Sequence, residues 1–173
     1  MRLYGVGVGP GDPELLTLKA LRVIKEADVI LIPRTSKGLT RSVVGDLVKD
    51  KEVVEFDLPL RGDRRIYQEV LRRVENYDKV IYLTLGDPSI YSSFYYAARL
   101  VMPVEVIPGI TSFSWCAALH KLPLIQGAET MAVAPVSRVS DVKADVVIAM
   151  KGELEGTVKC GSGYFTVNIL RRS

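Results

Sequence analysis

Hydrophobic residues along this chain alternate between short compact runs and longer stretches with helical spacing. The compact runs predict strands at 2–8, 29–32, 52–56, 79–84 and 104–107, of which the first is expected to be buried. The stretches between them carry apolar residues every three or four positions, which predicts helices at 12–27, 41–49, 63–75, 89–101 and 111–119. This regular alternation of strand and helix predicts an α/β fold whose N-terminal sheet is mainly parallel.

The pattern changes after Pro123. Strands are expected at 129–134, 145–150 and 164–170, and 135–144 is expected to form a loop or half-turn. The C-terminal part is therefore predicted to be a smaller unit with more β structure and a mixed sheet. The change of pattern places the domain boundary near 122–126, which gives domains at 1–122 and 123–173.

A glycine-rich stretch, Gly5-Val6-Gly7-Val8-Gly9-Pro10-Gly11-Asp12, follows the first expected strand. Its spacing does not fit the G-x-G-x-x-G dinucleotide fingerprint, because Pro10 or Asp12 stands where the third glycine belongs. Asp12 and Pro13 instead suit the start of a helix. The glycines are expected to supply turn geometry, and space for a bound molecule.

The tripeptide Gly11-Asp12-Pro13 recurs as Gly86-Asp87-Pro88, again after an expected strand and before an expected helix. For Asp12, capping of a helix and a role in a functional site both stay open, whereas the residues around Asp87 favour a functional role for that aspartate. Parallel sheets bind ligands at the carboxyl ends of their strands. We therefore expect three loops, 5–12, 86–91 and 108–113, to lie together at that edge.

Composition excludes several classes of protein. Hydrophobic content of 48% and charged content of 25% are ordinary for a globular chain, and a net charge of +3 is too small to indicate nucleic-acid binding. Apolar runs are too short to span a bilayer, and the first residues do not resemble a signal peptide, so a cytoplasmic location is expected.

The two cysteines, Cys116 and Cys160, lack metal-ligand or redox spacing. Cys116 lies in an apolar run and is expected to be a buried thiol. His120 is the one histidine, so a histidine-rich metal site is excluded and a structural role is expected for it. No metal is expected in the function.

Four motifs in this order resemble the tetrapyrrole (corrin/porphyrin) methylases: residues 5–12, Leu85-Gly86-Asp87-Pro88-Ser89-Ile90-Tyr91, Ile107-Pro108-Gly109-Ile110-Thr111-Ser112 and Tyr164-Phe165-Thr166-Val167. The resemblance covers roughly 1–151 and 163–170, and it is strongest to the subgroup that methylates C20 of precorrin-2 or cobalt-factor II. It implies a two-domain α/β methyltransferase of cobalamin biosynthesis, usually a homodimer, with S-adenosylmethionine in the cleft between domains and the tetrapyrrole beside it.

The same resemblance implies which residues border the cofactor, and these are Pro10, Gly86, Asp87, Ile90, Tyr91, Thr111, Ser112 and Met150. Plainer interpretations stay open, because Thr111 and Ser112 would also suit a helix cap, and Ile90 and Met150 would also suit a core. The catalytic base is unknown, with Tyr91 and Asp87 as weak candidates.

The family's substrate carries many carboxylates, which arginine binds through paired hydrogen bonds. We expect Arg34 or Arg41 to bind one of them. Further basic residues lie in the same loops, namely Lys37, Arg61, Arg64 and Arg65. The alternative for each of these residues is a solvated basic face.

The chain departs from the family between Lys151 and Gly163, where a helix, a strand and further loop usually intervene. Two interpretations follow. The chain is a compact enzyme whose site is closed by a partner subunit, or it has lost catalysis and kept ligand binding. Methylation at another ring position is a further alternative, since one methylase fold serves many ring carbons.

Overall fold

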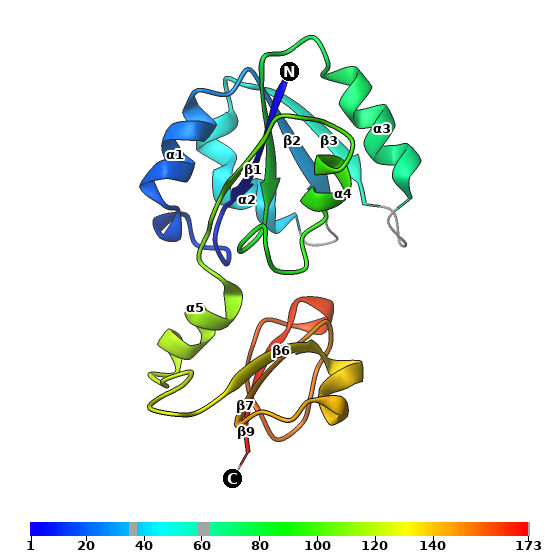
Figure 1. Ribbon diagram of the computed structural model, residues 1–173. Coiled ribbons are helices and arrows are strands. Elements are labelled where there is room, and N and C mark those ends of the chain that lie inside the picture. Colours follow the sequence, from blue (N-terminus) through cyan, green and yellow to red (C-terminus); the bar gives the residue numbers. More distant parts are fainter. Residues whose placement is uncertain (35–37, 59–62, 173) are drawn as a thin grey trace. The chain divides into compact units, whose positions relative to one another are not determined.

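The computed structural model describes residues 1–34, 38–58 and 63–172, and the chain divides into two compact units, Met1–Thr111 and Ser112–Ser173 (Figure 1). The boundary between the units lies N-terminal to the expected domain boundary at 122/123. The reason is that α5 (Ser112–Leu119) packs against β9 (Val167–Arg171) of the second unit. In the part of the chain that is described, helices are too short or too polar to cross a membrane.

The first unit is built on a 5-stranded sheet whose neighbouring strands are all parallel, as the sequence predicted. Its strand order is β3-β2-β4-β1-β5. The strands are β1 (Arg2–Gly7), β2 (Val29–Arg34), β3 (Glu52–Asp57), β4 (Lys79–Thr84) and β5 (Val104–Ile107). Because β1 lies between β4 and β5, the loops that leave these three strands begin at neighbouring points of one edge.

Helices cover both faces of this sheet (Figure 1). One core joins alternate strand residues such as Val6 and Ile30 to the apolar sides of the first two helices, and the other joins Leu3 and Leu31 to the apolar sides of the next two. The helices are α1 (Leu18–Lys25), α2 (Leu39–Val44), α3 (Arg64–Arg73) and α4 (Phe94–Ala98). The strands β1, β2 and β4 are buried on both faces and read as nearly continuous apolar runs, which is why the sequence located them.

Two of the expected helices are wrong in their extent. The helix expected at 12–27 begins at Leu18, because the Thr17 hydroxyl accepts a hydrogen bond from the Ala20 N–H at 3.1 Å. Asp12 caps only a short 3₁₀ turn, Pro13–Leu15. The helix expected at 89–101 is reduced to Phe94–Ala98. In addition, α2 is followed directly by a 3₁₀ turn at Gly45–Val48.

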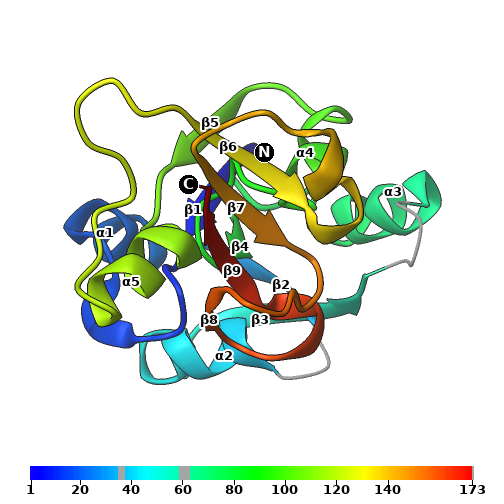
Figure 2. The ribbon, with the colours of Figure 1, turned by 90° about the horizontal axis from the view of Figure 1, so that it is seen from below.

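The second unit contains a 4-stranded mixed sheet in the order β6-β7-β9-β8 (Figure 2). Its strands are β6 (Met131–Pro135), β7 (Val146–Met150), β8 (Val158–Cys160) and β9, where β6 and β7 are parallel and β9 is antiparallel to both of its neighbours. The loop expected at 135–144 contains a 3₁₀ helix, Val136–Asp141, and a further 3₁₀ turn lies at Gly163–Phe165. The short strand β8 was not predicted.

The expectation of a free buried thiol at Cys116 is wrong, because Cys116 forms a disulfide bond with Cys160. The bond ties α5 to the last residue of β8, with the two Cα atoms 5.7 Å apart. A separation of 44 residues hid this pairing, since sequence spacing signals only local metal or redox motifs. Cys116 itself is buried, as expected.

Candidate functional site

The loops that follow β1, β4 and β5 meet at the carboxyl edge of the first sheet, which confirms the expected grouping. Backbone hydrogen bonds join the first two loops, because the Val8 N–H donates to the Thr84 carbonyl at 2.9 Å and Gly9 and Gly86 exchange bonds of 2.7 and 3.2 Å. We call these three segments, 8–12, 86–91 and 108–111, the loop cradle. Its position is the one at which parallel α/β sheets bind ligands.

Close backbone packing explains the glycines of the loop cradle. A Cβ atom built on Gly109 would lie 2.2 Å from the Gly86 carbonyl oxygen, and one built on Gly7 would lie 2.6 Å from the Gly109 nitrogen. The expectation that glycines leave space for a ligand therefore needs revision here. The main role of Gly7 and Gly109 is to allow the three loops to approach one another.

Asp87 fastens the second loop to the third. The side chain is buried, and its Oδ2 accepts a hydrogen bond from the Gly109 N–H at 2.9 Å. Its Oδ1 accepts from the Ser89 N–H at 2.8 Å and from the Ser89 hydroxyl. Asp87 thus sets the relative position of two loops, a role that its sequence motif did not reveal.

The same contacts decide the charge of Asp87. Burial raises the pKa of its carboxyl, but the hydrogen bonds from Ser89 and Gly109 outweigh burial and hold that pKa below its usual value. The carboxylate is therefore ionised at neutral pH and is a weak base. This favours binding of a cationic or hydroxyl group over proton abstraction, because Oδ2 keeps a second lone pair, whereas Oδ1 already accepts two hydrogen bonds from Ser89.

The other predicted cofactor residues of the first unit adjoin these contacts. Pro10 is half-buried and follows Gly9, and the Ile90 N–H donates to the Asp87 carbonyl at 3.1 Å. Tyr91 is exposed and has a φ of 50°, a left-handed conformation that costs a non-glycine residue about 1–3 kcal/mol. Thr111 is half-buried and ends the unit. Strained backbone of this kind concentrates at ligand sites.

Ser112 and Met150 belong to the second unit, where Ser112 begins α5 and Met150 ends β7. The turn after Met150 contains Lys151 at a φ of 64°. A residue that the sequence analysis missed holds this turn. The buried Asn168 side chain donates to the Ala149 and Gly152 carbonyls, at 2.9 Å each, and accepts from the Leu154 N–H. Its signal was an amide inside an otherwise apolar strand.

The two arginines expected to bind substrate differ in their partners. Arg34 ends β2 and makes two contacts with the Asp57 carboxylate, from Nε at 3.0 Å and Nη2 at 3.2 Å. Arg41 lies in α2 with its Nε 3.7 Å from Glu55. Among the described residues, the buried Nη1 of Arg41 finds no hydrogen-bond partner. Arg41 therefore keeps an unused donor for an anion, whereas Asp57 occupies Arg34.

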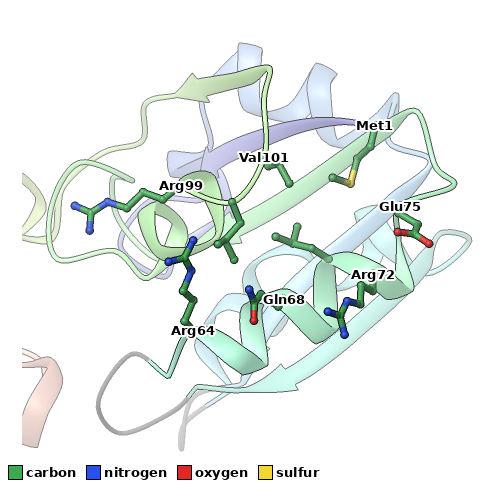
Figure 3. Close-up of a pocket in the computed structure, with 9 residues that line it drawn as sticks. Met1, Arg64, Gln68, Arg72, Glu75, Arg99 and Val101 are labelled. Carbon is green, nitrogen blue, oxygen red and sulfur yellow. The ribbon is translucent and has the colours of Figure 1, made fainter.

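Of the four remaining basic candidates, two belong to the described part of the chain. Lys37 and Arg61 fall outside the described residues. Arg65 donates its backbone N–H to the Asp63 cap of α3 at 2.9 Å. Arg64 instead lines a surface depression of about 390 Å³ between α3 and the segment after α4 (Figure 3). Its other lining residues are Met1, Gln68, Leu71, Arg72, Glu75, Arg99, Leu100 and Val101.

Comparisons with known proteins agree with the loop motifs. The family described as Tetrapyrrole (Corrin/Porphyrin) Methylases matches residues 2–159. A probable cobalt-precorrin-2 C(20)-methyltransferase of Methanocaldococcus jannaschii is 34% identical over 165 residues, which covers 87% of this chain and 72% of that protein. A precorrin-2 C(20)-methyltransferase of a Sinorhizobium species is 35% identical, covering 85% of this chain and 72% of its own length.

A solved structure extends the likeness to three dimensions. It is a uroporphyrin-III C-methyltransferase of Thermus thermophilus, determined in complex with S-adenosylhomocysteine. The TM-score is 0.64 at 31% identity, and the match covers 87% of this chain and 69% of the other. Fold and sequence thus point to the same family.

Proposed function

This chain belongs to the tetrapyrrole (corrin/porphyrin) methylase family, and we propose that it transfers a methyl group from S-adenosylmethionine to C20 of precorrin-2 or its cobalt form in cobalamin biosynthesis. The similarity to two C20-methyltransferases over most of the chain supports this specificity. The observation that carries the proposal is the loop cradle, in which Asp87 joins two motifs of the family at the ligand-binding edge of a parallel sheet.

The loop cradle suits the methyl donor chemically. S-adenosylmethionine presents an ammonium group, a carboxylate and ribose hydroxyls, and when bound it supplies an activated methyl group. An ionised Asp87 accepts from the ammonium or the hydroxyls, and the Thr111 and Ser112 hydroxyls bond polar groups of the ligand. Gly86 carries no side chain, so the ligand can approach the backbone of the second loop closely, and Pro10 borders it from the first loop.

The chain's part in the reaction is alignment. The acceptor carbon forms a bond to the methyl group as the sulfur–methyl bond breaks, and the electron pair of that bond stays on sulfur. C20 loses a proton afterwards. Holding both reactants in line can supply several kcal/mol of the barrier, of the order of 7–11 kcal/mol in the best-oriented systems. Tyr91 stays a candidate base at the rim of the loop cradle, whereas the lowered pKa of Asp87 favours a positioning role for it.

Arg41 is the proposed substrate-binding arginine. Its unpaired Nη1 can donate to a substrate carboxylate while its Nε stays near Glu55. We expect Arg41→Ala to raise KM for the tetrapyrrole by about tenfold, the loss of one charge-assisted hydrogen bond, with unchanged S-adenosylhomocysteine affinity. Arg34→Ala is the matched control. An equal effect of the two substitutions would contradict the assignment.

The shortened second unit supports a rival proposal, in which the chain binds ligands without catalysis. The stretch 151–162 contains only a turn and the short strand β8, and the chain covers 72% of each of the two C20-methyltransferases. Methylation of another ring carbon is the third possibility. All three are separated by one assay, incubation of the protein with labelled S-adenosylmethionine and sirohydrochlorin, with and without cobalt.

In this assay a trimethylated product carrying the label at C20, located by mass spectrometry and NMR, supports the proposed enzyme. Label at another carbon favours a different position specificity. Cofactor binding without turnover favours the non-catalytic protein. No cofactor binding at concentrations well above micromolar would contradict the proposed use of the loop cradle.

We further propose that the chain is cytoplasmic and, as the family resemblance implies, that it forms a homodimer. In a compact enzyme, the second subunit would then be available to close the site. Analytical ultracentrifugation with and without S-adenosylhomocysteine tests the assembly, and a mass of one chain in both conditions would contradict it.

A further inference from the structure

Three residues of the second unit, none of which belongs to the loop cradle, bring metal-binding atoms together. The Cys116 and Cys160 sulfurs and a His120 ring nitrogen all lie within 4.8 Å of one another. Cys116 and His120 are one helical turn apart, and the His120 N–H donates to the Cys116 carbonyl at 3.2 Å. Both side chains therefore share one side of the α5 turn, and Cys160 reaches them from the end of β8.

Two thiolates and an imidazole form a donor set that zinc prefers. We propose that, when the disulfide is reduced, Cys116, His120 and Cys160 bind one Zn²⁺ ion with a fourth position left to water. Binding releases the two thiol protons and requires neutral imidazole. The disulfide and the metal exclude each other, because the same two sulfurs form either bond.

The backbone geometry fits both states. Tetrahedral zinc with bonds of about 2.3 Å holds its two sulfurs about 3.8 Å apart. The two Cα atoms lie 5.7 Å apart, so this separation needs rotation of the cysteine side chains and leaves the backbone in place. His120 is exposed and Cys160 half-buried, which gives an ion a path to the site although Cys116 is buried.

The size of the second unit explains why such a cross-link would be useful. Units of roughly 60 residues rarely gain enough stability from a hydrophobic core alone, and natural ones add disulfides or a metal. One core of this unit contains Val139, Val147 and Ala149 as its buried residues, on the side of Val136–Asp141. Either cross-link joins α5 to β8 and so fastens the helix to the sheet.

Cobalt titration of the reduced protein tests the site. The full chain is reduced with a phosphine, transferred anaerobically into reductant-free buffer and titrated with Co²⁺. We expect one equivalent to bind with the thiolate-to-cobalt charge-transfer and visible bands of a tetrahedral site, and Zn²⁺ to bleach them. Oxidised protein should show neither band. A reduced wild-type protein without these bands would overturn the proposal.

The variant His120→Ala keeps both cysteines and separates a metal site from a plain thiol pair. We expect it to weaken Co²⁺ binding at least tenfold, since even outer partners of metal ligands change affinity by about 10–100-fold. Lys159→Ala, beside Cys160, is the matched control and should bind like wild type. Zn²⁺ should raise the Tm of reduced wild type and of the control, and less that of His120→Ala. Equal binding by all three proteins would exclude His120 as a ligand.

Discussion

The tripeptide Gly-Asp-Pro occurs twice at the same edge of one parallel sheet, with different consequences. After β1, the exposed Asp12 accepts a hydrogen bond from the Glu14 N–H at 2.9 Å and caps a 3₁₀ turn. After β4, the buried Asp87 accepts from Ser89 and reaches the Gly109 N–H in another loop. Local chemistry is the same in both copies, so their surroundings determine the role.

Strand order supplies that difference. Asp87 and Gly109 follow β4 and β5, which flank β1. The two outer loops meet across β1 only because Gly7 places no side chain between them. Among the described residues, the Asp12 carboxylate has the Glu14 N–H as its hydrogen-bond partner, and a Cβ atom built on the preceding Gly11 would lie in open space. A capping motif therefore gains a further function when another loop places a backbone N–H within its reach, as the Gly109 loop does for Asp87.

We expect the largest effect from a substitution at Gly109, whose close contact with the Gly86 loop distinguishes the second copy of the tripeptide from the first. Gly109→Ala places a methyl group 2.2 Å from the Gly86 carbonyl oxygen, so the loops must separate. We expect a loss of about 1–3 kcal/mol in the free energy of unfolding, together with loss of S-adenosylhomocysteine binding. Urea unfolding and calorimetry measure the two effects.

Gly45→Ala is the control for that substitution, since Gly45 has a helical φ of −40° and open space around it. It should leave ligand binding unchanged and stabilise by up to about 1 kcal/mol. If Gly109→Ala behaved like this control, the close packing of the loop cradle would be wrong.

Removing the charge of Asp87 or of Asp12 should give the next largest difference in the free energy of unfolding. Asp87→Asn turns one accepting oxygen into a donor that faces an N–H group, so we expect a loss of about 1–3 kcal/mol. Asp12→Asn should change stability by less than about 0.5 kcal/mol, because asparagine caps helices as well as aspartate does. Urea midpoints of both variants decide the matter, and similar losses would remove the distinction between the two copies.

Acid stability follows from the lowered pKa of Asp87. Its folded-state pKa lies below the unfolded value, so its contribution is complete above the unfolded pKa of about 4 and disappears as pH falls through the folded pKa. The free energy of unfolding of wild type should decrease over that acidic range more steeply than that of Asp87→Asn. Parallel curves between pH 2 and 6 would show that Asp87 does not contribute.

The smallest predicted effect concerns the residue four positions after each aspartate. Tyr91 has a φ of 50° and Leu16 a φ of −67°. At Tyr91, glycine should be more stable than alanine by about 1 kcal/mol, because glycine adopts the left-handed conformation freely. At Leu16 the order should reverse by about 0.5–1 kcal/mol. Thermal unfolding of the four variants measures both differences, and the same order at both positions would contradict the predicted contrast.

The sequence predicted the parts of the fold that depend on burial and chain direction. Clusters of apolar residues identified all five strands of the first sheet, most clearly the nearly continuous runs of β1, β2 and β4, and the parallel arrangement placed three loops at one edge. Helix ends were harder, because Asp12 and Thr17 are both good caps and only tertiary packing chooses Thr17. The three-residue strand β8 and the bond from Cys160 to Cys116 depend on distant partners, which residue patterns do not encode.

For the site, motif resemblance named the loops but not their internal contacts. The bond from the Gly109 N–H to Asp87 involves a backbone group, and the Asn168 contacts in the second unit end on carbonyls. Backbone N–H and carbonyl groups occur along the whole chain, so the sequence does not show which of them a side chain will bind. Arg34 and Arg41 looked alike in the sequence and were distinguished only by the acidic residues that the neighbouring strand β3 brings beside them.

Titration calorimetry with S-adenosylhomocysteine tests most directly whether Asp87 of the second Gly-Asp-Pro tripeptide, and not Asp12 of the first, belongs to the binding site. We predict that wild type binds one S-adenosylhomocysteine per chain and that Asp12→Ala binds it with an affinity within about twofold of wild type. Asp87→Ala should bind at least about tenfold more weakly, because it loses charge-assisted hydrogen bonds. Equal affinities of the two variants, or no binding by wild type, would contradict this prediction.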